Sequence, residues 1–290
     1  MPSLKEYKAK LASLQNTRKM TKTMKMVATS KLSKTMDAQR KATAYAEALH
    51  AMIERLSASV DPTAHPLLQS RPHPKNCLVL VITSDKGMCG GFNNNLLKFV
   101  HRWLHQPPKQ YARIDVSFCG RRGWLALRQR RKVAQYYEGV TARPTFGHAV
   151  RIAKDVTQAF LSGEYDEVYL AYSHFVSPLA QKPLMNFLLP IEHHEVRVGE
   201  EGIHENYLLE PDQKELLAML LPKIIEFEIY YALLENAAGE NGARMTAMDN
   251  ATRNADDMIK TYTLLRNRAR QAAITKELIE IISGAESLKG

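Results

Sequence analysis

The chain has 290 residues, 45% hydrophobic content and a formal net charge of +10, which is typical of one large or two modest folded domains and argues against a disordered protein. No apolar run approaches the ~20 residues of a membrane-spanning helix. The N-terminus is too polar for a secretory signal and does not resemble a transit peptide. Cys77, Cys89 and Cys119 lack metal-ligand spacing, so we expect buried thiols, a reducing compartment and no metal site.

The positive charge is concentrated at the start of the chain. Residues 1–41 hold eleven Lys or Arg residues and only two acids, Glu6 and Asp37, which gives +9 for this segment. Such a run predicts an acidic partner, which could be nucleic acid, anionic lipid or an acidic protein surface. Beyond Tyr7 no aromatic residue interleaves the lysines, which disfavours base stacking, and membrane anchors of the Trp or Phe type are missing. An acidic protein surface is therefore the favoured partner.

The first predicted element is one long helix. Neither glycine nor proline occurs between Ser3 and Ser59, a stretch that would form a helix of about 80 Å. Ser3 and Glu6 have the spacing of a capping box. The expected apolar stripe is regular at first and then thins among lysines and threonines; it consists of Leu4, Tyr7, Leu11, Leu14, Met20, Met24, Val27 and Leu32.

The middle of the chain alternates between strands and helices. Four prolines between residues 61 and 75 predict a linker. The expected strands are Cys77–Ser84, Ile114–Cys119, Glu167–Phe175 and an extended stretch Met185–Leu189, and the expected helices are Asn93–Leu104, Trp124–Arg128 and Gly147–Leu161. This order predicts a small Rossmann-like α/β domain over residues 76–200 with a mainly parallel sheet.

The glycine-rich turn after the first strand is a weak candidate for a nucleotide site. Residues 85–93 contain Gly87, Gly90 and Gly91, but their spacing fits neither dinucleotide nor P-loop patterns. A tight turn that requires positive φ is the favoured interpretation. The adjacent His193 and His194 would point to opposite faces of a strand and make a poor metal chelate. We therefore expect no active site and no cofactor in this chain.

The last predicted element is a second long helix, residues 211–288. Small or apolar residues recur there with a heptad period, which indicates a left-handed coiled coil. One row is Ala251, Met258, Leu265, Ala272 and Ile279, and the other is Met248, Ala255, Tyr262 and Ala269. The simplest partner is the helix of residues 1–60, folded back as an antiparallel pair. The alternative is an ordinary bundle, which lacks further helices of matching length.

Three segments of the sequence resemble the γ subunit of the F-type rotary ATP synthase. Residues 15–31 (QNTRKMTKTMKMVATSK) resemble that family's first shaft helix, and residues 87–93 (GMCGGFN) its glycine motif, with Met88 where leucine is more usual. Residues 270–285 (RQAAITKELIEIISGA) are similar to its C-terminal signature. The likeness covers nearly the whole chain.

This resemblance implies a fold, a function and partners. In that family the terminal helices form an antiparallel coiled coil inside a ring of three α and three β subunits, and the α/β domain contacts ε and the c-ring. Catalysis occurs on β, so this chain would be a non-catalytic rotor shaft that couples ion flow to ATP synthesis or hydrolysis. The expected location is the cytoplasmic face of the bacterial inner membrane, reached only indirectly through the c-ring.

The resemblance also assigns contact residues by position. The residues expected to meet the ring are Met24, Lys25, Arg244, Arg270, Gln271, Thr275 and Glu277. The residues expected to form an apolar bearing tip are Leu278, Ile279, Ile281 and Ile282. The residues expected at the foot that meets ε and the c-ring are Tyr207 and Glu210. Two alternatives stay open on sequence grounds: a basic coiled-coil nucleic-acid-binding protein, and a nucleotide-dependent enzyme built on the glycine turn.

Overall fold

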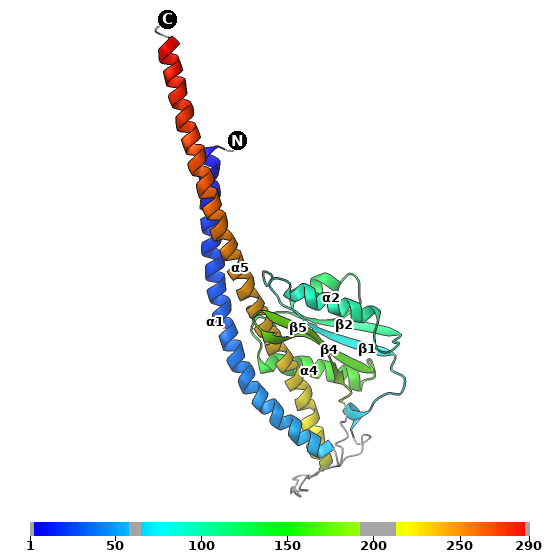
Figure 1. Cartoon of the computed structure of the whole chain (residues 1–290). Coiled ribbons are helices and arrows are strands. Elements are labelled where there is room, and N and C mark those ends of the chain that lie inside the picture. Colours follow the sequence, from blue (N-terminus) through cyan, green and yellow to red (C-terminus); the bar gives the residue numbers. More distant parts are fainter. Residues whose placement is uncertain (1–2, 58–64, 192–212, 288–290) are drawn as a thin grey trace. The chain divides into compact units, whose positions relative to one another are not determined.

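Along the chain, one long helix precedes an α/β segment with a five-stranded sheet, and a second long helix follows it (Figure 1). The computed structural model describes residues 3–57, 65–191 and 213–287. The elements are α1 (Leu4–Ser57), the 3-10 helix η2 (Pro66–Leu68), β1 (Asn76–Ile82), α2 (Phe92–His105), β2 (Arg113–Cys119), α3 (Arg121–Leu127), β3 (Val133–Tyr137), α4 (Phe146–Leu161), β4 (Glu167–Ser177), β5 (Ala180–Leu189) and α5 (Gln213–Ser287). The long terminal helices and the α/β segment confirm the predicted fold class.

The chain divides into two compact units, and each is described by itself. One unit combines residues 1–28 with residues 245–290, and the other contains residues 29–244. Both long helices therefore contribute to both units. The predicted division along the sequence into residues 1–60, 61–75, 76–200 and 211–288 stays a prediction.

The sheet of the larger unit has the strand order β3-β2-β1-β4-β5. The first four strands are parallel, with Val79 opposite both Val116 and Tyr169, and β5 runs antiparallel to β4. This arrangement confirms the mainly parallel sheet. The edge strand β3 was missed, because Val133–Tyr137 is short and follows a run of charged residues that looks like a loop.

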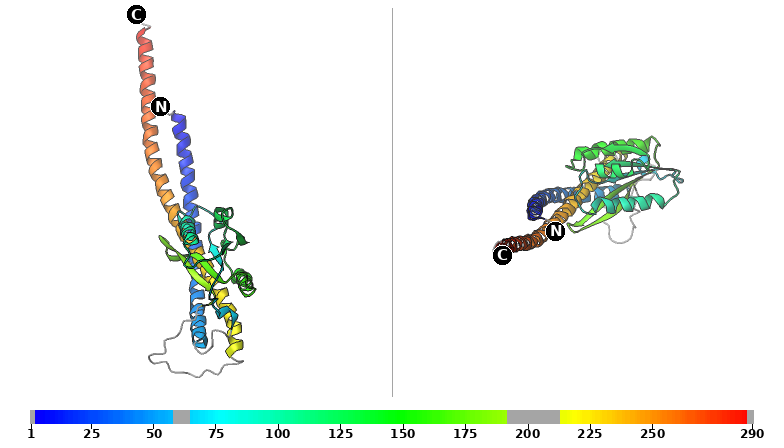
Figure 2. Two further views of the ribbon diagram at one scale, coloured as in Figure 1. Left: turned by 90° about the vertical axis from the view of Figure 1, so that its right-hand side faces the viewer. Right: turned by 90° about the horizontal axis from the view of Figure 1, so that it is seen from above.

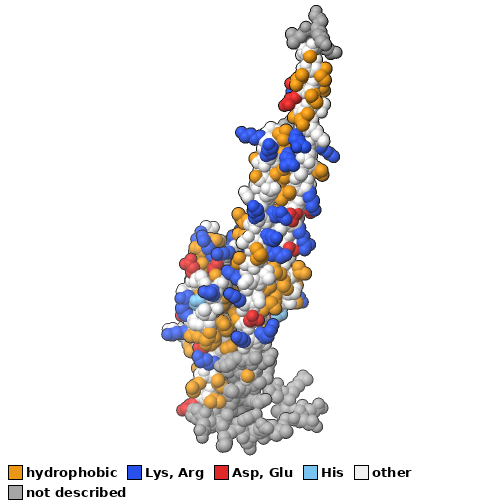
Figure 3. Space-filling model, turned by 90° about the vertical axis from the view of Figure 1, so that its left-hand side faces the viewer, with side chains coloured by type: hydrophobic (Ala, Val, Ile, Leu, Met, Phe, Trp, Pro, Cys, Tyr) orange, Lys and Arg blue, Asp and Glu red, His pale blue; other side chains and the backbone are white. Residues whose placement is uncertain are grey.

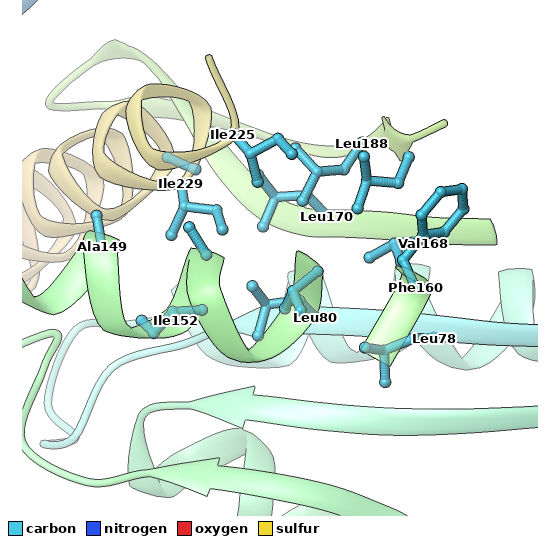
Figure 4. Packing of buried hydrophobic residues seen from close by; sticks show 14 of the residues in the cluster. Leu78, Leu80, Ala149, Ile152, Phe160, Val168, Leu170, Leu188, Ile225 and Ile229 are labelled. Carbon is cyan, nitrogen blue, oxygen red and sulfur yellow. The ribbon is translucent and has the colours of Figure 1, made fainter. Parts of the chain in front are cut away.

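Each face of the sheet buries its own hydrophobic core. Because side chains alternate along a strand, β1 sends Leu78, Leu80 and Ile82 to one face and Cys77, Val79 and Val81 to the other. Helices α4 and α5 cover the first face, where Ile152, Ile225 and Ile229 meet Leu80 and Leu170 (Figure 4). Helices α2 and α3 cover the second.

Part of the predicted linker belongs to this core. Leu67 and Leu68 of η2 are buried, at 1% and 5% exposure. His65 caps the turn by accepting a hydrogen bond from the backbone N–H of Leu67 at 3.2 Å. The proline-rich segment therefore separates α1 from the sheet and also packs against the core through Leu67 and Leu68.

The capping and cysteine predictions are confirmed. The backbone N–H of Glu6 donates to Ser3 Oγ at 3.3 Å, and the backbone N–H of Ser3 donates to Glu6 Oε2 at 3.3 Å. Cys77, Cys89 and Cys119 are free thiols and buried, and burial raises the pKa of each. Among the described residues, no helix is long and apolar enough to cross a membrane.

Candidate functional site

In the unit made of residues 1–28 and 245–290, α1 and α5 form an antiparallel coiled coil (Figures 1 and 2). The cross-helix contacts show the antiparallel direction, because residue numbers rise along α1 as they fall along α5. These contacts join Tyr7 with Tyr262 (ring centroids 6.3 Å apart), Arg18 Nε with Asp256 Oδ1 (2.6 Å), Thr252 Oγ1 with Thr21 Oγ1 (2.7 Å) and Lys25 Nζ with Asp249 Oδ1 (2.6 Å). The antiparallel pairing predicted from sequence is thus confirmed.

The predicted stripe of α1 is correct except at two positions, Met20 and Val27, where the seam lies one residue further along. Leu11 and Leu14 are buried as expected, but Met20 and Val27 are 64% and 51% exposed. Their neighbours Thr21 and Ala28 occupy the seam, at 8% and 1% exposure. The prediction followed hydrophobicity alone. A threonine that hydrogen-bonds across the helices and an alanine that permits close approach preserve the alternating three- and four-residue spacing, which methionine and valine at the neighbouring positions do not.

On α5, the predicted seam row that begins at Met248 is correct, and the row that begins at Ala251 is correct only in part, since Ala251 and Leu265 are half-buried. Met248 and Ala255 are buried, at 7% and 4% exposure, whereas Met258 is 51% exposed. The residues next to this second row, Thr252 and Ile259, are half-buried, and the Thr252 hydroxyl pairs with Thr21. Because Thr252 is polar, a prediction based on apolar residues alone did not place it in the seam.

The same spacing continues along α1 within the larger unit. Leu32 and Ala42 are buried there, and the Gln39 amide donates to Glu235 of α5. Glu235 is fully buried and also accepts hydrogen bonds from His174 Nδ1 at 2.7 Å and from the backbone N–H of Phe175 at 2.6 Å. One carboxylate therefore joins α1, α5 and β4. Sequence analysis missed it; its signal was a lone acid inside the apolar run Ala232–Ala238.

The C-terminal end of α5 has no companion in the part of the chain that the structure describes. This end, which follows the Tyr7–Tyr262 contact, extends beyond the N-terminal end of α1 in Figure 1 and in the left view of Figure 2. Large apolar side chains nevertheless lie exposed on its surface (Figure 3). They are Leu264, Ile274, Leu278, Ile279, Ile281 and Ile282, between 50% and 67% exposed. Since an apolar cluster of this kind marks an interaction surface, the end of α5 is the candidate functional site.

The predicted ring-contact residues of this end are also exposed. Arg270, Gln271, Thr275 and Glu277 lie on the surface of the single helix. Their neighbour Lys276 forms an i,i+4 pair with Glu280 at 3.6 Å. The structure thus presents these four side chains outward, and their contact with a ring stays a prediction.

Two other predicted contact residues are engaged within the coiled coil or beside it. Met24 is half-buried. Lys25 is bonded to Asp249, and this hydrogen bond, with Arg253 at 2.8 Å from the same carboxylate, holds the pKa of Asp249 below its usual range. The Lys25 side chain keeps 42% of its surface exposed, so pairing and an external contact are compatible.

Arg244 lies in the larger unit and fastens α5 to the glycine turn. Its guanidinium pairs with Glu240 and donates from Nη2 to the carbonyl oxygen of Gly87 at 3.2 Å. Only 12% of the side chain is exposed. Burial raises the pKa of Glu240 while the Arg244 charge opposes that rise. The predicted contact of Arg244 with the ring stays a prediction.

The glycine turn is tight and filled by the chain itself. Gly90 has the expected positive φ of 58°, and Met88 shares it at 61°. The polar groups of Ser84 and Asn93 bond to each other, and the Asn236 amide of α5 donates to the carbonyl oxygen of Thr83 at 3.3 Å. A Cβ at Gly239 of α5 would lie 2.8 Å from the Phe92 ring. Helix α5 therefore packs directly against the turn where a phosphate would approach.

The remaining predicted positions lie outside the described residues. These are the foot residues Tyr207 and Glu210, together with His193 and His194. Among the residues that the structure does describe, no group of three or more His, Cys, Asp or Glu side chains is arranged to hold a metal ion.

Comparison with known proteins places the chain in one family. A family model described as ATP synthase matches residues 3–288. Proteins named ATP synthase gamma chain from Geobacter metallireducens and Trichlorobacter lovleyi are 45% and 42% identical, with the whole of each chain covered. The central stalk of the Tetrahymena thermophila mitochondrial ATP synthase is 25% identical, with a TM-score of 0.60 over 80% of this chain and 99% of that one.

A Euglena gracilis mitochondrial ATP synthase chain shares the fold, with a TM-score of 0.66 at 19% identity over 98% of this chain and 94% of that one. Together, the whole-length matches and the shared fold establish the relationship. The chain belongs to the ATP synthase gamma chain family.

Proposed function

We propose that this chain is the central rotor shaft of an F-type ATP synthase, turning inside a ring of three α and three β subunits. The observation that carries the proposal is the exposed apolar end of α5, where Ile279, Ile281 and Ile282 are 58%, 67% and 61% exposed. An apolar sleeve in the ring would cover them. Family membership and the antiparallel coiled coil support the same role.

The shaft acts by contacting each β subunit differently. A single asymmetric rod in a threefold ring biases the three β subunits toward different conformations. Shifting a two-state equilibrium from 1:99 to 99:1 requires about 5.5 kcal/mol of differential contact energy. Exposed polar side chains such as Arg270, Thr275 and Glu277 suit this purpose, because their contacts can be exchanged between equivalent sites without a deep energy minimum.

The basic surface of α1 provides the second proposed contact. Most Lys and Arg side chains of residues 1–41 are exposed, and an acidic helix–turn–helix of β would face them. Met24, Lys25 and Arg244 belong to this contact. Arg18 and Lys25 already pair with α5, so these two basic residues also hold the shaft together.

The chain is non-catalytic in this proposal. The reaction takes place on β, and this chain transmits rotation driven by ion flow through the c-ring. Tyr207 and Glu210 form the foot that meets ε and the c-ring. The complex lies at the cytoplasmic face of the bacterial inner membrane, which this chain reaches only through the c-ring. Packing of α5 against the glycine turn argues against the nucleotide-dependent enzyme.

Reconstitution tests this function directly. The full chain is mixed with purified α and β subunits, and particle mass and ATPase activity are measured. A particle of three α, three β and one copy of this chain, with ATPase activity that depends on it, is the expected result. A chain that stays apart from the ring but retards duplex DNA at physiological salt would instead support the nucleic-acid-binding alternative.

A further inference from the structure

A second basic concentration lies in the α/β segment, separate from α1. Between Asp115 and Glu138 the sequence contains six Lys or Arg residues and no acid. They form the arginine patch: Arg121, Arg122, Arg128, Arg130, Arg131 and Lys132. The net charge of the chain beyond residue 41 is small, because acidic residues elsewhere balance the positive charge of the patch.

The charges of this patch are presented to solvent. Arg121, Arg122, Arg128 and Arg130 are exposed and form no ion pair with another described residue. Lys132 lies 3.6 Å from the buried Asp115, a carboxylate that Arg113 already holds. A solvated charged surface normally mixes both signs, so a basic patch with four arginines that form no ion pair with described residues points to an external acidic partner.

The fold fixes the backbone that carries these arginines. The backbone N–H of Gly123 donates to Thr83 Oγ1 at 2.9 Å, and Leu127 is buried against the sheet. At the far end, Arg131 Nη2 donates to the carbonyl oxygen of Leu104 at 3.4 Å. The patch is therefore a preorganised surface, which reduces the entropy lost when a partner binds.

The aromatic residue at the centre of the patch, Trp124, is half-buried and already contacts two neighbouring side chains. Trp124 stacks on Tyr136 with ring centroids 4.9 Å apart, and Arg128 lies 4.4 Å from its ring. Base stacking on single-stranded nucleic acid needs a free aromatic face, and a membrane-surface helix needs exposed apolar anchors. Leu125, at 42% exposure, is the only large apolar side chain exposed among described residues 121–132. These features disfavour single-stranded nucleic acid and lipid as the partner, and duplex DNA is left to the test.

We infer that the arginine patch docks an acidic polypeptide segment of another protein, a contact additional to the shaft role. Arginine forks match carboxylate groups in bidentate geometry. Five of the six basic residues are arginines, which suits this recognition better than lysines would.

The test compares two variants of the full chain with the same loss of charge. In the patch variant Arg121, Arg122, Arg128 and Arg130 are changed to Gln; in the control variant Arg40, Arg143, Lys154 and Lys182, which are exposed but scattered, are changed to Gln. Binding of a fluorescein-labelled oligoglutamate peptide is measured by anisotropy. We expect the patch variant to bind about tenfold more weakly than the control variant, since it loses four charges that lie within ten residues of the chain.

Equal weakening in the two variants would overturn the inference. So would a patch-specific loss that is larger for phosphatidylglycerol vesicles or duplex DNA than for the peptide. If the patch variant fails to fold, a photo-crosslinkable oligoglutamate on the wild-type chain decides the matter: crosslinks within residues 113–137 support the inference, and crosslinks confined to α1 contradict it.

Discussion

Two stretches of the same helix, α5, have opposite environments. From Ala232 to Gly242 every residue is buried, because the sheet, α1 and the glycine turn surround the helix. From Ile274 to Ala285 every residue is exposed. Both stretches are apolar enough to form a core. The first stretch therefore completes the core of the folded chain, whereas the second is available to a partner.

The largest expected effect comes from shortening a side chain in the buried stretch. Leu233 is fully buried in the core, so Leu233→Ala should lower the free energy of unfolding by about 2–5 kcal/mol. The matched change Ile279→Ala, at 58% exposure, should leave it nearly unchanged in the isolated chain. Denaturant unfolding of both variants checks this. Similar losses in the two variants would contradict the division.

A smaller effect is expected from adding one methyl group. Gly239→Ala would place a Cβ 2.8 Å from the Phe92 ring, and such overpacking should lower the free energy of unfolding by about 1–3 kcal/mol. Gly284→Ala serves as its control, since a Cβ there meets nothing within 4 Å. That change should be neutral or slightly stabilising, because alanine favours helix more than glycine does. A tolerated Gly239→Ala would show that α5 does not press against the turn.

Reversing a charge at the exposed end should affect coupling and leave folding intact. Glu277→Lys alters a solvated side chain, so the unfolding curve of the isolated chain should match that of the wild type. In the reconstituted complex, coupled ATPase activity should fall several-fold, which corresponds to about 1 kcal/mol of lost contact energy. Unchanged coupling would remove Glu277 from the ring contact.

The smallest effect is a pH dependence within the coiled coil. Lys25 lowers the pKa of Asp249 in the folded chain. A carboxyl group whose folded pKa is depressed stabilises the fold above its unfolded pKa of about 3.9, and this contribution is lost as the pH falls through the folded value.

Asp249→Asn should therefore be less stable than the wild type at about pH 6, with the difference shrinking as the pH falls below about 4. Denaturant unfolding at several pH values measures this difference. A gap that stays constant with pH would mean that the Lys25 pair contributes nothing to stability.

The fold was largely predictable, because the spacing of apolar residues along the sequence indicates where helices and strands form. The apolar run at Leu78–Ile82 and the long glycine-free and proline-free stretches identified the sheet and the helices. The polar seam was not predictable in the same way, since Thr21 and Thr252 stabilise it by hydrogen bonding rather than by hydrophobicity. Periodicity located a coiled coil but selected neighbouring residues for some of its contacts.

The candidate site was predicted through family likeness more than through residue chemistry. Exposure of Ile279 and its neighbours could not be inferred from a heptad pattern, which would place them in a seam. The arginine patch was missed because charge was summed over long segments. A local count over residues 116–137 would have found it.

Hydrogen exchange of α5, measured in the free chain and in the reconstituted complex with α and β subunits, tests whether its C-terminal end is covered only by partner subunits. We expect amides of residues 221–242 to be protected in both states, and those of residues 270–285 to exchange rapidly in the free chain and to become protected in the complex. Slow exchange at the C-terminal end of the free chain, or rapid exchange there within the complex, would contradict this expectation.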